Sequence, residues 1–91
     1  MGLKSTTSCL GYQQITSLSS AQSLTVPVGA TMALIVPETQ AVRWRDDRTA
    51  PTASVGMPVA VGESLNYDGD LKSIRFIEQT ASAKINVSYY A

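Results

Sequence analysis

Short segments in which apolar and polar residues alternate dominate this sequence, and they constrain its fold more than any other feature. The clearest segment is residues 83–90, where every second position is apolar: Ile85, Val87 and Tyr89. A period of two places these side chains on one face of a β-strand. No long stretch shows the 3.6-residue period of an amphipathic helix. The sequence therefore predicts an all-β chain.

Glycine, proline and aspartate separate these segments at regular intervals and favour turns between them. We predict strands in eight ranges: 9–16, 23–26, 31–36, 42–46, 56–62, 63–67, 71–78 and 83–90. Pro37 is expected to end the third strand, within a tight turn that leads to the fourth. The dipeptide Asp68-Gly69 is expected to form a two-residue hairpin turn. Seven to eight short strands of this kind indicate a small antiparallel β-sandwich or barrel.

The chain has 91 residues, which predicts one domain, residues 9–91, preceded by a polar arm, residues 1–8. A domain of this size buries only about 60–65% of its unfolded surface. Charged residues make up 15% of the chain, and 20 serines and threonines take the place of the missing charges. Such a composition suits a surface partly covered by neighbouring subunits, although secreted β-domains share it.

Charge and hydropathy also exclude some partners. Seven basic and seven acidic side chains give a net charge of zero, which provides no electrostatic footprint for nucleic acid. No stretch approaches 18 consecutive apolar residues, so no membrane contact is expected. The first 20 residues lack the apolar core of a secretory signal, and a cytosolic site of synthesis is therefore expected.

The residue types needed for catalysis are scarce. The chain has no histidine, which removes the commonest general base and the usual zinc ligand. Cys9 is the only cysteine, so it cannot form an internal disulfide and has no histidine to activate it. We predict no enzyme activity, no catalytic residue and no cofactor.

Two acidic pairs, Asp46 with Asp47 and Asp68 with Asp70, are the remaining candidates for chemistry. Carboxylates in pairs can bind calcium or act in glycoside hydrolysis. Turn chemistry explains the second pair, and the neighbouring cations Arg45 and Arg48 would neutralise the first. We therefore predict no metal site.

Residues 40–58 form the stretch around which the chain is organised. Val42 and Trp44 alternate with two arginines, so the tryptophan is expected to anchor a strand in the core. The strand leads into a charged turn whose members are the first candidate interface residues: Arg45, Asp46, Asp47 and Arg48. An alternative function uses the same tryptophan as a stacking platform for sugar, as in carbohydrate-binding modules. That alternative requires Trp44 to be exposed beside a groove.

Together with residues 67–71, 74–81 and 83–90, this stretch resembles small structural proteins of tailed-bacteriophage virions. The resemblance covers roughly residues 36–90. It implies a noncatalytic virion component, made in the host cytoplasm, that decorates or cements the capsid and binds other virion proteins such as the major capsid protein. A neck, tail or fibre component is the alternative within the virion. The resemblance also implies glycine after Trp-Arg-Asp-Asp, where this chain has Arg48. If that glycine has positive φ, Arg48 is either strained or marks a slightly different loop.

The last residues suggest self-association. Consecutive strand residues face opposite ways, so one ring of Tyr89 and Tyr90 must leave the core, and Tyr90 is the further interface candidate. A thin core and sparse charge also favour a homo-oligomer. A trimer is our first expectation, because the resemblance suggests a head protein and shells offer threefold positions. A dimer is the second.

Overall fold

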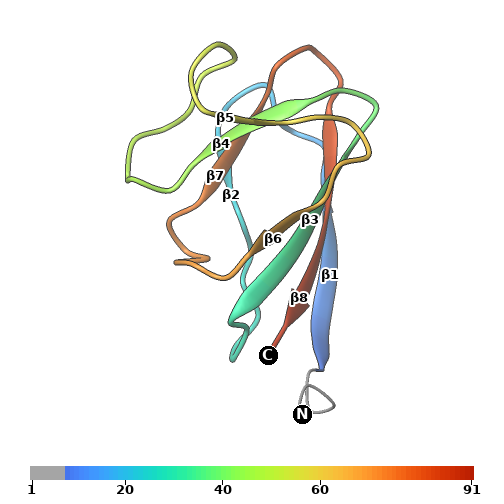
Figure 1. Cartoon of the computed structure of the whole chain (residues 1–91), viewed down its shortest axis with the longest axis vertical. Helices are drawn as coiled ribbons and strands as arrows, with labels where there is room; N and C mark the ends of the chain where they lie inside the picture. The colour runs from blue at the N-terminus through green and yellow to red at the C-terminus, as the bar shows by residue number, and fades with distance from the viewer. Residues whose placement is uncertain (1–7) are drawn as a thin grey trace.

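A computed structural model describes residues 8–91, which form two antiparallel four-stranded sheets packed as a small β-sandwich (Figure 1). Sheet A has the strand order β1-β8-β3-β6, and sheet B has the order β2-β7-β4-β5. The strands are β1 (Cys9–Ile15), β2 (Gln22–Ser23), β3 (Met32–Glu38), β4 (Val42–Arg45), β5 (Met57–Val59), β6 (Leu65–Tyr67), β7 (Arg75–Glu78) and β8 (Lys84–Tyr90). The predicted all-β sandwich is confirmed. No helix long and apolar enough to cross a membrane occurs in this part of the chain.

The core lies between the inward faces of the two sheets. In β8 the alternation predicted from the sequence is confirmed, because Ile85, Val87 and Tyr89 are at most 1% exposed. Sheet B contributes Phe76 from β7 and Val42 from β4, both fully buried. Burying a side chain of this size stabilises the fold by about 1.5–3 kcal/mol. The contacts between the sheets are therefore the main source of stability.

Tyr89 brings a polar group into this core, and that group has a partner. Its hydroxyl donates a hydrogen bond to the Gln13 side-chain oxygen, which also accepts one from the Thr25 backbone N–H at 2.9 Å. Burial raises the pKa of Tyr89 to about 12. The ring thus ties β8 and β1 to the segment that follows β2.

The prediction that Pro37 ends its strand is wrong. β3 continues to Glu38, and Pro37 pairs with Ile85 of β8. The Pro37 carbonyl accepts a hydrogen bond from the Gly62 N–H at 3.1 Å, so its nitrogen faces the same side. On that side the pairing with β6 stops at Ile35. The missing N–H therefore costs the sheet no ladder hydrogen bond.

The hairpin predicted at Asp68-Gly69 is wrong, because β6 belongs to sheet A and β7 to sheet B. For the same reason β3 and β4 do not pair across their short connection. Asp70 instead stabilises a turn, accepting hydrogen bonds from the Lys72 N–H at 3.1 Å and the Ser73 hydroxyl at 2.7 Å. This turn delays the start of β7 to Arg75.

Other strand ends differ less from the prediction. The strand expected at residues 23–26 is reduced to Gln22–Ser23. The predicted arm, residues 1–8, lies outside the described residues except for Ser8. Ser8 exchanges two backbone hydrogen bonds with Ala91, at 3.0 and 3.1 Å, so the ladder between β1 and β8 extends one residue beyond Cys9.

Gly69 provides the first testable prediction. A Cβ atom at this position would lie 2.5 Å from the Tyr67 hydroxyl oxygen, so Gly69→Ala must displace a buried ring. We expect a loss of about 1–3 kcal/mol in the free energy of unfolding, measured by denaturant titration. Gly11→Ala is the matched control, since its Cβ would meet Pro27 at an ordinary 3.5 Å. Equal stability of the two variants would contradict the close packing of Tyr67 on Gly69.

Candidate functional site

β4 holds the candidate site in the middle of sheet B, between β7 and β5. Val42 and Trp44 both face inward, but only Val42 is fully buried. Trp44 is half-buried and packs against the core from its rim, with its ring edge-to-face on Tyr67 at a centroid distance of 5.8 Å. The expectation that Trp44 anchors the core is therefore corrected. The strands next to the Trp44 ring are β5 of the same sheet and β6 of the opposite sheet. Each has only three residues, so part of the indole is left uncovered.

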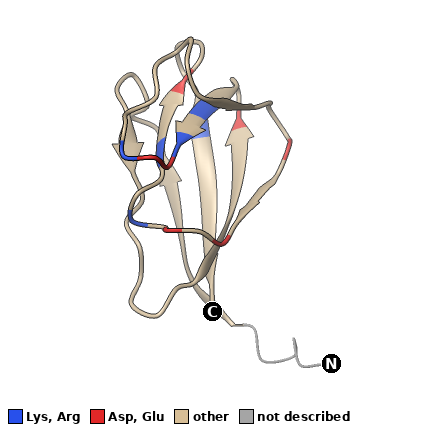
Figure 2. Cartoon of the chain, turned by 60° about the vertical axis from the view of Figure 1, so that its left-hand side comes forward, with Lys and Arg blue, Asp and Glu red and all other residues tan. Residues whose placement is uncertain are grey.

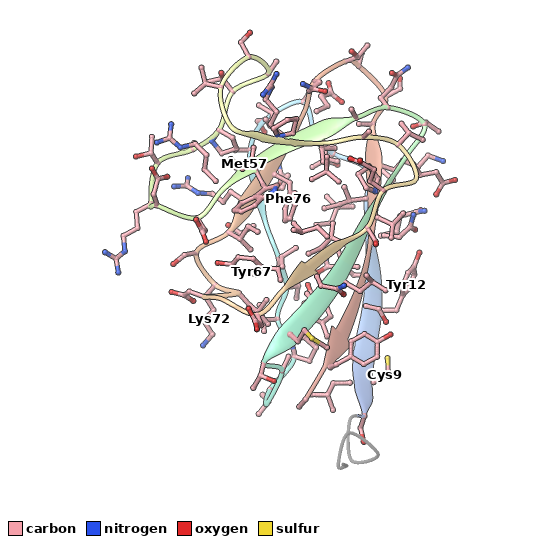
Figure 3. The ribbon with its side chains drawn as sticks, in the orientation of Figure 1. Cys9, Tyr12, Met57, Tyr67, Lys72 and Phe76 are labelled. Carbon is pink, nitrogen blue, oxygen red and sulfur yellow. The ribbon has the colours of Figure 1, made fainter. Side chains whose placement is uncertain are left out.

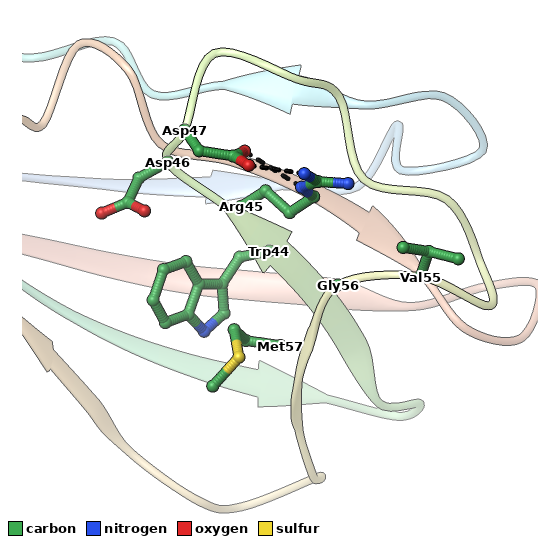
Figure 4. Close-up of a pocket in the computed structure, with 7 residues that line it drawn as sticks. All are labelled: Trp44, Arg45, Asp46, Asp47, Val55, Gly56 and Met57. Carbon is green, nitrogen blue, oxygen red and sulfur yellow. Dashed lines mark hydrogen bonds and ion pairs between the residues drawn. The ribbon is translucent and has the colours of Figure 1, made fainter.

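The uncovered side of Trp44 faces a hollow of about 610 Å³ (Figure 4). Its lining combines exposed apolar residues with the start of the charged turn: Trp44, Arg45, Asp46, Asp47, Val55, Gly56 and Met57. Val55 is 54% exposed and Met57 57% exposed. A second hollow of about 560 Å³ shares Trp44 and Met57 with the first. Apolar surface next to charge is thus accessible along this edge of sheet B.

Within the charged turn, Arg45 and Asp47 form an ion pair with two hydrogen bonds (Figure 4). The guanidinium Nε lies 3.0 Å from Oδ1 of Asp47, and the second contact joins Nη2 to Oδ2. The hydrogen bond from Arg45 lowers the pKa of Asp47 below its usual value. Both side chains are partly exposed, so the pair shapes the turn more than it stabilises the fold.

Asp46 points away from that pair and connects the turn to sheet A. It accepts a hydrogen bond from the Tyr67 hydroxyl at 2.6 Å. Burial, followed by this hydrogen bond to a carboxylate, raises the pKa of Tyr67 to about 12. The turn is therefore fastened to β6 as well as to β4.

Arg43 fastens the other end of the loop and was not identified from the sequence. Its guanidinium donates to the carbonyls of Ala53 at 3.1 Å and Gly56 at 2.8 Å. The Gln79 side chain, oriented with its amide oxygen toward the Arg43 guanidinium, accepts two further hydrogen bonds from it, at 3.0 and 2.8 Å. The sequence marks Arg43 only as an outward cation of a strand, because its partners lie on the β4–β5 loop and on the residue that follows β7.

Arg48 has φ of 69°, the left-handed conformation that glycine adopts most readily. Of the two alternatives left open for this position, strain and a different loop, the positive φ agrees with the first. Asp46, Asp47 and Arg48 also line a hollow of about 350 Å³ with Asp70 and Ser73. The structure thus brings members of the two acidic pairs to one hollow, but residues 8–91 contain no group of three or more possible ligands arranged to hold a metal ion.

The remaining candidate, Tyr90, lies apart from the charged turn. It is half-buried at the end of β8, where it pairs with Met32 and Cys9. Figure 3 shows Cys9 at the end of the molecule near the chain termini, and Met57, beside Trp44, toward the other end. The interface candidates therefore form two separate regions.

Comparison of the chain with family models, with curated proteins and with solved structures gives no match. The assignment to virion proteins therefore remains a proposal that rests on the sequence motifs.

A second prediction concerns the backbone at Arg48. The left-handed conformation costs a residue that has a Cβ atom roughly 1–2 kcal/mol. Glycine avoids this cost, but it loses more conformational entropy on folding, which offsets part of the gain. We expect Arg48→Gly to raise the free energy of unfolding by about 0.5–1 kcal/mol, measured by denaturant titration. Arg48→Ala removes the same guanidinium but keeps Cβ, and it should give no gain. A glycine variant no more stable than the alanine variant would contradict strain at this residue.

A third prediction concerns alkaline pH. The unfolded chain loses the tyrosine proton near pH 10, whereas the pKa of folded Tyr67 is about 12. The stabilising contribution of the protonated ring is thus complete below about pH 10 and is lost as the pH rises toward 12. We expect the melting temperature to fall over this interval, and to fall less steeply in Tyr67→Phe. Tyr89 contributes in the same direction, so the slope should not vanish.

Melting curves at several pH values measure these slopes. Tyr12→Phe, which removes an exposed hydroxyl, is the matched control. Identical slopes in the parent and in Tyr67→Phe would contradict the pKa assigned to Tyr67.

Proposed function

We propose that this chain is a noncatalytic structural protein of a bacteriophage virion, a capsid decoration or cement protein that binds other virion subunits. The observation that carries the binding role is the apolar surface of Trp44, Val55 and Met57 beside the Arg45–Asp47 ion pair. We call this area the Trp44 surface and include Asp46 in it. The virion assignment is supported by the sequence resemblance over roughly residues 36–90.

The composition of the Trp44 surface is typical of protein interfaces. Aromatic residues, methionine and arginine are enriched there, because they combine large contact area with selective hydrogen bonding. Arg45 is already paired with Asp47, so this part of the surface is a locally neutral patch. Covering such a patch costs less than covering an unpaired charge.

The Trp44 surface is also held in place before a partner arrives. Arg43 binds two carbonyls of the loop, and Asp46 binds Tyr67 of the opposite sheet. Ordering a loop during association lowers affinity, so a loop fixed in advance binds more tightly. These contacts support a role in adhesion, with the major capsid protein as the first candidate partner and a neck, tail or fibre subunit as the alternative.

The fourth prediction tests this role. Replacing both Asp46 and Asp47 with Asn should weaken binding of the purified protein to virus particles that lack it, by roughly tenfold or more. The melting temperature should change little, since the exposed Arg45–Asp47 pair adds at most about 1 kcal/mol, and an amide oxygen at position 46 can still accept the hydrogen bond from Tyr67. Asp68→Asn, which removes an exposed carboxylate outside the turn, is the matched control. Binding measured by co-sedimentation that is unchanged in the double variant would contradict the proposal.

Two further measurements separate the alternatives. A calcium-dependent rise in melting temperature that the double variant abolishes would indicate a cation site in place of a contact turn. The half-buried ring of Trp44 beside the 610 Å³ hollow favours a carbohydrate-binding module as the second candidate function. Oligosaccharide binding by the parent, lost in Trp44→Ala, would support that candidate.

Self-association also remains a proposal. The sequence suggests a trimer first and a dimer second, and light scattering coupled to size exclusion distinguishes them. A monomer whose melting temperature does not depend on concentration would exclude both.

A further inference from the structure

The sandwich has four edge strands, and one of them differs from the others. β2 has two residues, β6 has three, and β5 has three including Pro58. Proteins protect sheet edges by such short strands, by proline and by charge, because an open edge pairs with other chains. β1 is seven residues long and contains neither proline nor a charged residue. Its one protective feature is a bulge between Cys9 and Gly11, which leaves Gly11–Ile15 as a regular edge.

The hydrogen-bond ladders that β8 forms with β1 and β3 determine which backbone groups of β1 face its open side. The Thr31 N–H donates to the Tyr90 carbonyl at 2.9 Å, so Tyr90 directs its backbone groups toward β3. Because direction alternates along a strand, Tyr89, Val87 and Ile85 direct theirs toward β1. Their partners in β1 are Gly11, Gln13 and Ile15.

The residues between those partners, Tyr12 and Gln14, therefore direct their N–H and C=O groups away from β8. Within residues 8–91, no backbone group forms a hydrogen bond with them on that side. Two donors and two acceptors thus lie along an accessible edge, where an extended strand would satisfy all four.

The side chains around this edge hold it rigid without covering it. On the outer face, Tyr12 and Gln14 both donate to the Asn86 side-chain oxygen, at 2.5 and 3.0 Å. On the inner face, Gln13 binds Tyr89 and Thr25. Tyr12 remains 63% exposed. Only the in-plane edge of β1 lacks a neighbour in this part of the chain.

We propose that β1 pairs with β1 of a second copy of this chain, antiparallel around a twofold axis at Gln13, joining two copies of sheet A into one continuous sheet. In this register Tyr12 of each copy lies opposite Gln14 of the other. Opposite residues exchange two hydrogen bonds at such positions, so both residues satisfy their free groups. The edge is self-complementary, which closes the assembly as a dimer.

The charge distribution favours a second copy as the occupant. Residues 5–37 and 85–91 contain no Lys, Arg, Asp or Glu, and among residues 8–91 Figure 2 shows no charged residue at the end of the molecule where the C-terminus lies. Twofold pairing places each residue near its own copy, so any charge there would meet a like charge. An uncharged strand avoids that repulsion. A strongly charged partner would find no complementary charge on this strand.

The pairing goes beyond the proposed function, because it uses a surface distant from the Trp44 surface and needs no virion partner. A regular edge of five residues spans about 17 Å, which is small for a protein interface. We therefore expect a dissociation constant on the order of 1–100 μM. Particle binding and dimerisation can fail independently of each other.

The fifth prediction tests the edge directly. Gln14→Pro replaces the outward N–H with the proline ring and removes no hydrogen bond between β1 and β8. Gln14→Ala is the matched control, since it loses the same bond to Asn86 but keeps the N–H. Light scattering at about 10 to 500 μM should show a dimer at high concentration for the parent and for Gln14→Ala. The proline variant should remain a monomer with a parent-like circular dichroism spectrum.

Amide hydrogen exchange of the parent provides a readout that does not depend on the folding of a variant. The amides of Tyr12 and Gln14 should exchange about three- to sixfold more slowly at the highest concentration than at the lowest, which is the fall in monomer fraction expected for that range of dissociation constants. The amide of Gln13, which already faces β8, should not change. A parent that is monomeric or trimeric at every concentration would overturn the proposal, as would a dimer whose Tyr12 and Gln14 amides exchange at the monomer rate.

Discussion

Packing of the two sheets against each other is the interaction on which the rest of the structure depends. Ile85, Val87 and Tyr89 of β8 supply one side of this contact, and Ile74 and Phe76 supply the other. The chain passes between the sheets at every connection except the one from β4 to β5. Each strand therefore finds its hydrogen-bonding partners only when distant parts of the chain have met, and the inward apolar residues make that meeting favourable.

The single connection that stays within one sheet is also the one that carries the candidate interface. Between β4 and β5 the chain leaves the core for residues 46–56, and polar contacts then determine its shape. Arg43, the Arg45–Asp47 pair and the bond from Tyr67 to Asp46 hold this loop. The apolar members of the Trp44 surface in this loop and at its end, Val55 and Met57, are exposed and can therefore change in sequence without loss of the fold.

The two proposed surfaces lie on different sheets and differ in chemistry. The Trp44 surface combines apolar side chains with a paired charge, whereas the β1 edge offers unpaired backbone groups in an uncharged region. Because they do not overlap, self-association through β1 would leave the Trp44 surface of both copies available. Two copies would then present two binding surfaces, which increases apparent affinity for a repeating target such as a shell.

Local patterns in the sequence determined which segments form strands and which side chains face inward. The alternation in residues 83–90 placed Tyr89 inside and Tyr90 outside. The motif before Arg48 left strain and a different loop as alternatives, and only the structure shows its positive φ. Strand pairing was decided only by the tertiary structure, which placed β6 and β7 in different sheets and let Pro37 remain in β3. It also buried Leu18 within a segment expected to be a connection, left Trp44 at the rim, and gave Arg43 its partners. The physical reason is range: the direction of a side chain depends on its immediate neighbours, whereas burial and pairing depend on residues far away in the chain.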